Sequence, residues 1–250
     1  MRPIATSPPT LAGTIRTGSS SWLLIAGGAL IFMTFMRYSL PELGWIVFAP
    51  LLAFLHERGT LGRHLALLAT LVVAFLAAIS KMATTEIPWA PVPMFAVPIA
   101  ISYFIALSFA GWAHRRLGVR WGIYGFVSVV VVMGWVQYTF TPASSWGVLA
   151  HTQLDNLPLV QLAAVTGISG ITFLVALGSG LAAAAWRAGF RALQLDLLLF
   201  AIALLSAFVY GQLRLGEPSP GAAIRVAGVV SPVTHREFRE AVRDLETIRR

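Results

Sequence analysis

Three residues with catalytic side-chain types lie close together in one polar stretch of the sequence, residues 141–159. Ser145, His151 and Asp155 are the residue types of a hydrolase triad, in which the histidine activates the serine and the aspartate orients the histidine. No glycine-flanked nucleophile motif surrounds Ser145, and three such residues are common by chance in a polar loop. His151 and Asp155 have no apparent third partner for a metal. We therefore predict no catalytic residue, metal site or cofactor in this chain.

The remaining ionisable residues indicate no other reaction. The chain contains no cysteine, which excludes disulfides, zinc–thiolate sites and a cysteine nucleophile within these residues. Its one lysine, Lys81, lies in a short gap between apolar stretches. Three histidines, His56, His64 and His114, flank the ends of such stretches and are expected at a membrane interface. Asp196 is expected to reach the water around lipid headgroups.

Seven apolar stretches must position any functional site. Hydrophobic residues make up 57% of the chain and charged residues 11%, against about 45–50% and about 25% in soluble domains. A helix crosses a bilayer core with about 20 apolar residues. The stretches are Trp22–Met36, Leu43–Leu55, Leu65–Ser80, Val92–Ala113, Trp121–Phe140, Val160–Trp186 and Leu195–Leu213, of which the first two are short. We predict an all-α polytopic membrane domain of about seven transmembrane helices over residues 22–213.

The basic residues between these stretches alternate in number. One side collects nine cations, Arg2, Arg16, Arg58, Arg63, Arg115, Arg116, Arg120, Arg187 and Arg191, and the other side collects two, Arg37 and Lys81. Because basic loops resist translocation, the nine-cation side is predicted to be cytoplasmic. Residues 1–21 are then a cytoplasmic tail, and the chain after Leu213 lies outside. This topology accounts for the net charge of +8, so no nucleic-acid partner is predicted.

Small residues recur in the sixth stretch, in Thr166–Gly170 and again in Gly178–Gly180. Residues of this size let helices approach closely, and the first group also permits a short irregular segment before the helix. We interpret both groups as packing features rather than as ligand contacts.

The sequence changes character after Leu213. Residues 214–222 are rich in proline and glycine, which is typical of a linker. The valine-rich segment Ile224–Val230 predicts a buried strand, and Thr234 and Glu237 have the spacing of a capping box before an amphipathic helix. One strand and one helix bury too little surface to fold alone. Residues 223–250 are therefore predicted to be the incomplete start of an α/β domain.

Four segments of the chain match the patterns of one known family. They are Ser145–Gln153, which keeps Trp146, Leu149 and Gln153, together with Leu162–Val175, Leu43–Leu52 and Arg225–Pro232. On these segments the chain resembles the bacterial apolipoprotein N-acyltransferases over most of residues 40–235. The resemblance implies a multi-pass domain in the cytoplasmic (inner) membrane of a bacterium, with a cytoplasmic N-terminus, followed by a periplasmic nitrilase-like domain.

The chain departs from the family pattern at three places. Gly134–Gln137 stands where the family has Glu-Trp-Leu-Arg, Ser231–Val233 replaces Gln-Pro-Asn, and Ser179 replaces an asparagine of the sixth span. These differences indicate a divergent member.

The resemblance also implies a reaction. A cysteine of a Glu–Lys–Cys triad takes an acyl chain from a phospholipid donor as a thioester, and passes it to the α-amino group of a diacylglyceryl-cysteine lipoprotein acceptor. The glutamate is the general base, and the lysine stabilises the oxyanion. All three residues would follow residue 250, so residues 1–250 alone are expected to be inactive, with the catalytic domain missing from this chain.

Two other functions compete with this one. The first is a short or split homologue that acts as a membrane scaffold, or binds lipid, beside a separate catalytic domain. The second is an unrelated carrier or channel, which is disfavoured because no span has an interior charged residue that would mark a transport path.

Trp146, His151 and Gln153 are the candidates for binding the lipid substrate. A tryptophan can lie at the headgroup level, and histidine and glutamine can donate hydrogen bonds to a phosphate or an ester. Stabilisation of the loop is the simpler interpretation of all three residues, and both interpretations stay open at this point.

Overall fold

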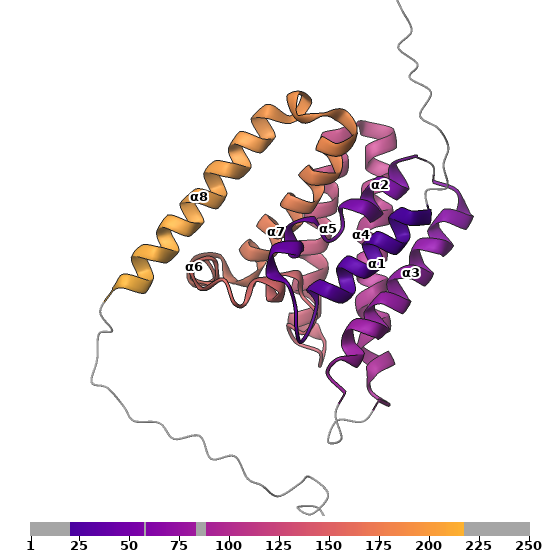
Figure 1. Cartoon of the computed structure of the whole chain (residues 1–250), viewed down its shortest axis with the longest axis horizontal. Coiled ribbons are helices and arrows are strands. Elements are labelled where there is room, and N and C mark those ends of the chain that lie inside the picture. Colours follow the sequence, from indigo (N-terminus) through magenta and orange to yellow (C-terminus); the bar gives the residue numbers. More distant parts are fainter. Residues whose placement is uncertain (1–20, 58, 84–88, 218–250) are drawn as a thin grey trace, which may run out of the picture.

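The computed structural model describes residues 21–57, 59–83 and 89–217, which are helical throughout their regular structure and contain no strand. The α-helices are α1 (Ser21–Thr34), α2 (Ala49–Glu57), α3 (Leu61–Ser80), α4 (Val92–Leu117), α5 (Val119–Phe140), α6 (Leu157–Val160), α7 (Ala163–Ala188) and α8 (Gln194–Gly216). Three 3₁₀ helices join them, η1 (Pro41–Ile46), η2 (Leu149–Gln153) and η3 (Phe190–Leu193). Figure 1 shows the longer helices side by side in one bundle.

Five helices are long and apolar enough to cross a membrane, which confirms the predicted all-α membrane domain. They are α3, α4, α5, α7 and the continuous segment Phe190–Gly216. The predicted count of seven is not confirmed, because α1 and Pro41–His56 are shorter. Several long helices also continue through arginines at which the apolar stretches stopped. Arg63, Arg115 and Arg187 each lie within a helix, since a charge at a helix end does not interrupt backbone hydrogen bonds.

The predicted tail lies almost wholly outside the described residues. Helix α8 ends at Gly216, within the predicted linker 214–222. The predicted strand and helix of residues 223–250 lie outside the described part of the chain.

Side-chain contacts define two ends of the bundle. At the end that we call the arginine face, the Arg115 guanidinium donates to the Leu55 carbonyl at 2.7 Å, and the Arg63 guanidinium donates to the Phe54 carbonyl. At the opposite end, the loop face, the Lys81 ammonium donates to the carbonyls of Phe32 and Phe35, both at 2.6 Å. The contacts therefore place Arg63 and Arg115 at one end of the helices and Lys81 at the other.

The core surrounds the segment of residues 41–57, which we call the enclosed segment. It comprises η1 and α2 and contacts α1, α4 and α7. Every residue from Val47 to His56 is buried. Its Phe48 ring stacks on Tyr103 of α4 at 4.5 Å and meets the edge of Phe126 of α5 at 5.7 Å between centroids. The segment predicted as the second span is thus a short, broken helix inside the bundle.

The small residues Gly178–Gly180 of α7 lie at close contacts with neighbouring segments, in line with their interpretation as packing features. A Cβ on Gly178 would lie 3.2 Å from the Trp45 carbonyl oxygen, and one on Gly180 would lie 3.0 Å from Ile123 of α5. Gly167, in the first group of small residues, has a different role. Its φ of 64° breaks α7 near its start, and a Cβ there would meet nothing within 4 Å. This is the short irregular segment that the sequence permitted, and its backbone favours glycine.

Two of the expectations for ionisable residues are wrong. Asp196 is only 7% exposed, because its carboxylate accepts hydrogen bonds from the Arg120 guanidinium at 3.1 Å and from the Tyr124 hydroxyl at 2.8 Å. His56 is likewise buried, with its ring stacked on that of His114 at 3.8 Å. Both residues connect helices inside the protein instead of facing lipid headgroups.

Candidate functional site

The candidate site is the polar loop, residues 141–159, which joins α5 to the start of α7 at the loop face. The first half of the loop is bound to Gln137, in the last turn of α5. The Gln137 amide donates to the carbonyls of Ser144, at 3.1 Å, and Trp146. The Thr141 hydroxyl donates back to the Gln137 carbonyl at 2.7 Å. Gln137 is the last residue of the segment that departs from the family pattern, and here it organises the loop.

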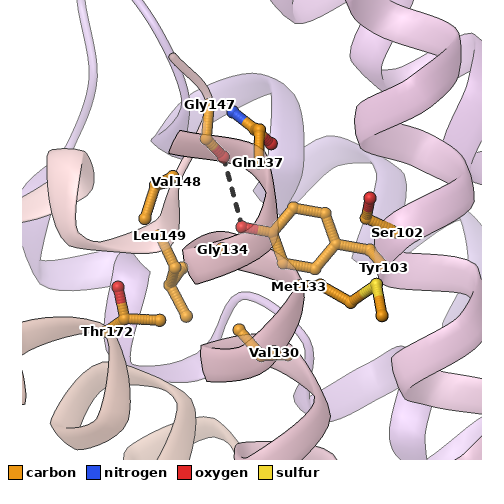
Figure 2. A pocket seen from close by; sticks show the side chains of 10 residues that line it. All are labelled: Ser102, Tyr103, Val130, Met133, Gly134, Gln137, Gly147, Val148, Leu149 and Thr172. Atoms are coloured by element: carbon orange, nitrogen blue, oxygen red, sulfur yellow. Dashed lines mark hydrogen bonds between the residues drawn. The ribbon is translucent and has the colours of Figure 1, made fainter. Parts of the chain in front are cut away.

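The middle of the loop packs against α4 at Gly147. The Tyr103 hydroxyl donates to the Gly147 carbonyl at 3.2 Å, as Figure 2 shows. Gly147 has a φ of 75°, and a Cβ there would lie 2.5 Å from the Ile99 side chain. Both the backbone conformation and the close approach therefore require glycine.

A cavity of about 20 Å³ lies beside this hydrogen bond, lined by residues of α4, α5, α7 and the loop. That volume corresponds to room for about one water molecule. The Thr172 hydroxyl lines the cavity and has no hydrogen-bond partner among the described residues. The cavity is too small for an acyl chain, so it belongs to the internal packing of the loop.

Trp146 is the most exposed of the three predicted lipid-binding residues. Its side chain is 43% exposed, and its ring lies 5.6 Å from that of Phe95, near the start of α4. The Phe95 contact and the Gln137 hydrogen bond to its carbonyl fix the position of the indole. Tryptophan is enriched at the headgroup level of membranes, and this partly exposed indole lies in a loop at one end of the bundle.

Gln153 faces inward. Its side chain is 1% exposed, and its amide donates to the Pro41 carbonyl of η1 at 2.7 Å and to the Thr152 hydroxyl at 3.3 Å. A Cβ on Gly44 would lie 2.8 Å from the same amide nitrogen. The amide donor thus joins the polar loop to the enclosed segment, which favours the structural interpretation of this residue.

His151 lies half-buried in η2. Burial lowers the pKa of its imidazole below the ordinary value, because the charged form loses water. The neutral imidazole is therefore the principal form at neutral pH. The structure does not bring the predicted residues to one point, since Trp146 packs on α4 while Gln153 packs on η1.

The hydrolase-triad residues do not form a constellation either. Among the described residues, Ser145, His151 and Asp155 make no hydrogen bond or ion pair with one another. The described part of the chain also has no group of three or more histidine, cysteine, aspartate or glutamate side chains that could hold a metal.

Sequence reasoning gave no role to two residues that contact the polar loop or the enclosed segment. Tyr103 lies in an apolar stretch, and nothing in the surrounding sequence indicates that its hydroxyl contacts the loop. Ser179 is fully buried in α7, where its hydroxyl lies 3.5 Å from both the Phe48 amide and the Gly44 carbonyl of the enclosed segment. In the sequence, Ser179 is notable only because the family has an asparagine at this position.

Comparison with known proteins gives a family. The model of the apolipoprotein N-acyltransferase N-terminal domain matches residues 27–181, which include the enclosed segment and the whole polar loop. A protein of Geobacter metallireducens (strain ATCC 53774 / DSM 7210 / GS-15), named apolipoprotein N-acyltransferase, is 29% identical over 220 residues. That match covers 82% of this chain and 42% of the relative, so the chain spans less than half of the relative's length.

No solved structure matches. The family model covers more than half of the chain. The relative bears the name of the same family, and its alignment with this chain is longer. The chain therefore belongs to the apolipoprotein N-acyltransferase family and contains the N-terminal membrane domain of that family.

Proposed function

We propose that this chain is the membrane part of a lipoprotein N-acyltransferase. In the proposed reaction, a phospholipid donates a fatty acyl chain, and the N-terminal diacylglyceryl-cysteine of a lipoprotein accepts it on its α-amino nitrogen. The match of the family's N-terminal domain to residues 27–181 is the observation that carries the proposal. Residues 1–250 contain no cysteine, so a nucleophilic thiolate for this transfer comes from another segment or another polypeptide.

The proposed topology places the arginine face in the bacterial cytoplasm and the loop face in the periplasm. Arg63, Arg115 and Arg120 lie at the first face, and the polar loop has no lysine or arginine. The asymmetry of positive charge supports this orientation. The N-terminal tail is then cytoplasmic, and the region after α8 is periplasmic, where the acceptor lipoprotein is reached.

Single cysteines introduced into residues 1–250 test the topology, because these residues contain none. In intact spheroplasts, an impermeant maleimide should label Ser145→Cys in the polar loop. It should label Leu117→Cys, at the end of α4, only after the membrane is opened. The reverse pattern would contradict the proposed orientation.

The polar loop is proposed to support the lipid substrate through Trp146. Its indole packs against Phe95 and is partly exposed, and its backbone carbonyl accepts a hydrogen bond from the Gln137 amide. We propose that the indole lies at the level of the phospholipid headgroups. In this account, Gln153 positions the loop on the enclosed segment, and a neutral His151 is available to donate or accept a hydrogen bond at a phosphate or ester.

A chimeric protein tests the function. Residues 1–217 of this chain would be joined to the part of the Geobacter relative that the match does not cover. The chimera would be expressed in a bacterium depleted of its own lipoprotein N-acyltransferase. We expect growth to be restored, and the Trp146→Ala chimera to lower acyl transfer by about tenfold at unchanged protein level.

The matched control is Trp135→Ala. Trp135 is also a half-exposed tryptophan, but it lies on α5, outside the polar loop. Equal transfer by both variants at wild-type level would reject the role of Trp146, and failure of a stably inserted chimera to restore growth would reject the proposed function.

A further inference from the structure

An apolar groove lies between α1 and α3, separate from the polar loop. Its volume is about 550 Å³, within the range of about 300–1,000 Å³ that is common for small-molecule sites. The lining residues recur every three or four positions along each helix; they are Ser21, Leu24, Ile25, Gly28, Ala29 and Phe32 on α1 and Ala69, Thr70, Val73, Ala74 and Ala77 on α3. The Thr70 hydroxyl donates to the Ala66 carbonyl of its own helix at 2.9 Å, which satisfies it without a ligand. The groove therefore offers an apolar ligand almost only hydrocarbon contacts.

A cation, Lys81, lies at one end of this groove, at the loop face. Lys81 follows Ala77 by one helical turn, so it continues the face of α3 that lines the groove. Its ammonium lies 4.8 Å from the centre of the Phe32 ring, which also lines the groove. The ammonium donates to the carbonyls of Phe32 and Phe35. A lysine has three donors, so one N–H remains for a ligand.

The length of the groove corresponds to one leaflet of a bilayer. At about 1.5 Å per residue, the lined face extends for roughly 16 Å on α1, from Ser21 to Phe32, and for roughly 12 Å on α3, from Ala69 to Ala77, with Lys81 one turn beyond. Half of a hydrocarbon core of about 30 Å is about 15 Å. The apolar part of the groove thus matches the depth of an acyl chain, with the Lys81 ammonium at the level of the phosphate.

We propose that this groove binds one resident phospholipid, with an acyl chain between α1 and α3 and its phosphate on the Lys81 ammonium. Helix α3 is a candidate membrane span, so the open side of the groove faces hydrocarbon and not water. Burial lowers the pKa of Lys81 below its usual value, and a phosphate beside it would favour the charged form. The lipid stabilises the contact of α1 with α3 and is not the acyl donor, so the proposal does not depend on the transferase function.

The test measures lipid retained by the purified full chain. The protein would be reconstituted in nanodiscs of phosphatidylethanolamine and phosphatidylglycerol, released into a mild detergent, and examined by native mass spectrometry. The wild type should retain one phospholipid per chain. Val73→Trp fills the groove and should lower retention by about tenfold, and Lys81→Met should lower it by a similar factor. Lys81→Arg keeps the charge and should retain the lipid.

Val132→Trp is the control for Val73→Trp. Val132 is about as exposed on α5 but lines none of this groove. Retention by Val73→Trp at the wild-type level would overturn the proposal. If the wild-type chain forms a dimer that Val73→Trp loses without a change in lipid, the proposal is also overturned and a second copy is the occupant. If Val73→Trp does not fold, the lipid retained by Lys81→Met and by Lys81→Arg is compared instead. Equal amounts of retained lipid would reject the phosphate contact.

The same variants in the chimera separate this proposal from the proposed function. A resident lipid predicts that Val73→Trp loses the bound lipid and keeps acyl transfer. Parallel loss of both from a stably folded chimera would make the groove a donor site and overturn the resident role. Retained lipid with no transfer by any chimera would reject only the transferase function.

Discussion

The enclosed segment and α8 are both apolar, but the first is broken and buried, whereas the second is continuous and largely exposed. The enclosed segment is interrupted between η1 and α2 and is buried from Val47 to His56. Helix α8 is continuous over 23 residues, and only 17% of its apolar stretch is buried. Figure 1 shows α8 at the edge of the bundle, where α6 lies against its C-terminal half.

The difference teaches where a broken backbone is tolerated in a membrane. In hydrocarbon, each unpaired amide or carbonyl costs several kcal/mol, so a lipid-facing segment must pair all of them within its own helix. The enclosed segment is instead completed by its neighbours. Ser179 approaches its break, Gln153 donates to its first carbonyl, and Arg63 and Arg115 donate to carbonyls at its end.

The largest effect is expected where α7 approaches the enclosed segment. Gly178→Leu would force a side chain onto Trp45, whose carbonyl is backbone and cannot move aside freely. Overpacking of this kind should destabilise the protein by about 3 kcal/mol. The change should appear as a lower melting temperature of the detergent-solubilised chain. A melting temperature like that of the wild type would contradict the close packing of η1 on α7.

The next effect is expected at the end of α2. Arg115→Met removes the donor to the Leu55 carbonyl and leaves it unpaired in a partly buried position, at a cost of about 2 kcal/mol. Arg116→Met is the matched control, because this substitution removes the same charge from the exposed residue next to Arg115, on the same face. Equal melting temperatures for the two variants would show that charge, and not the hydrogen bond, matters there.

A smaller effect is expected where the polar loop meets the enclosed segment. Gln153→Leu removes the 2.7 Å hydrogen bond to the Pro41 carbonyl and should cost about 1 kcal/mol. Gln161→Leu is the comparison, since the Gln161 amide donates only at 3.5 Å to the Leu157 carbonyl, one turn earlier in the chain. If Gln153→Leu lowered acyl transfer of the chimera at unchanged stability, the amide would act on substrate and not only on the loop.

The smallest effect is expected on α8. Val209 is half-exposed to lipid, so Val209→Ala should change stability by no more than about 0.5 kcal/mol. The same substitution at Val47, which is fully buried, should cost several times more because it leaves a cavity. Similar melting temperatures for both variants would remove the contrast between the two regions.

The sequence predicted the helical membrane domain and the packing of Gly178–Gly180 because both depend on residue size and hydropathy. It did not predict the break between η1 and α2. Apolar composition is the same on both sides of a break, and only Pro41 and Pro50 marked it locally. The burial of Asp196 was also missed, since its partners Arg120 and Tyr124 come from α5, far away in the sequence.

The candidate site was predicted only in part. Trp146 and Gln153 could be selected from the family pattern and His151 from the polar loop, but their residue types do not say whether a side chain faces lipid or backbone. Gln153 is the instructive case, because an amide can donate equally well to a phosphate and to the Pro41 carbonyl. That choice depends on the fold of η1, which no local pattern specified.

The mass of a lipoprotein N-terminal peptide tests the central claim most directly. Cells depleted of their own N-acyltransferase would express either the chimera or the relative's uncovered part alone, and the modified cysteine peptide would be examined by mass spectrometry. If residues 1–217 are the membrane part of such an enzyme, the chimera should add an N-linked acyl chain and the part alone should not. A peptide that stays diacylated in cells with stably inserted chimera would contradict the account.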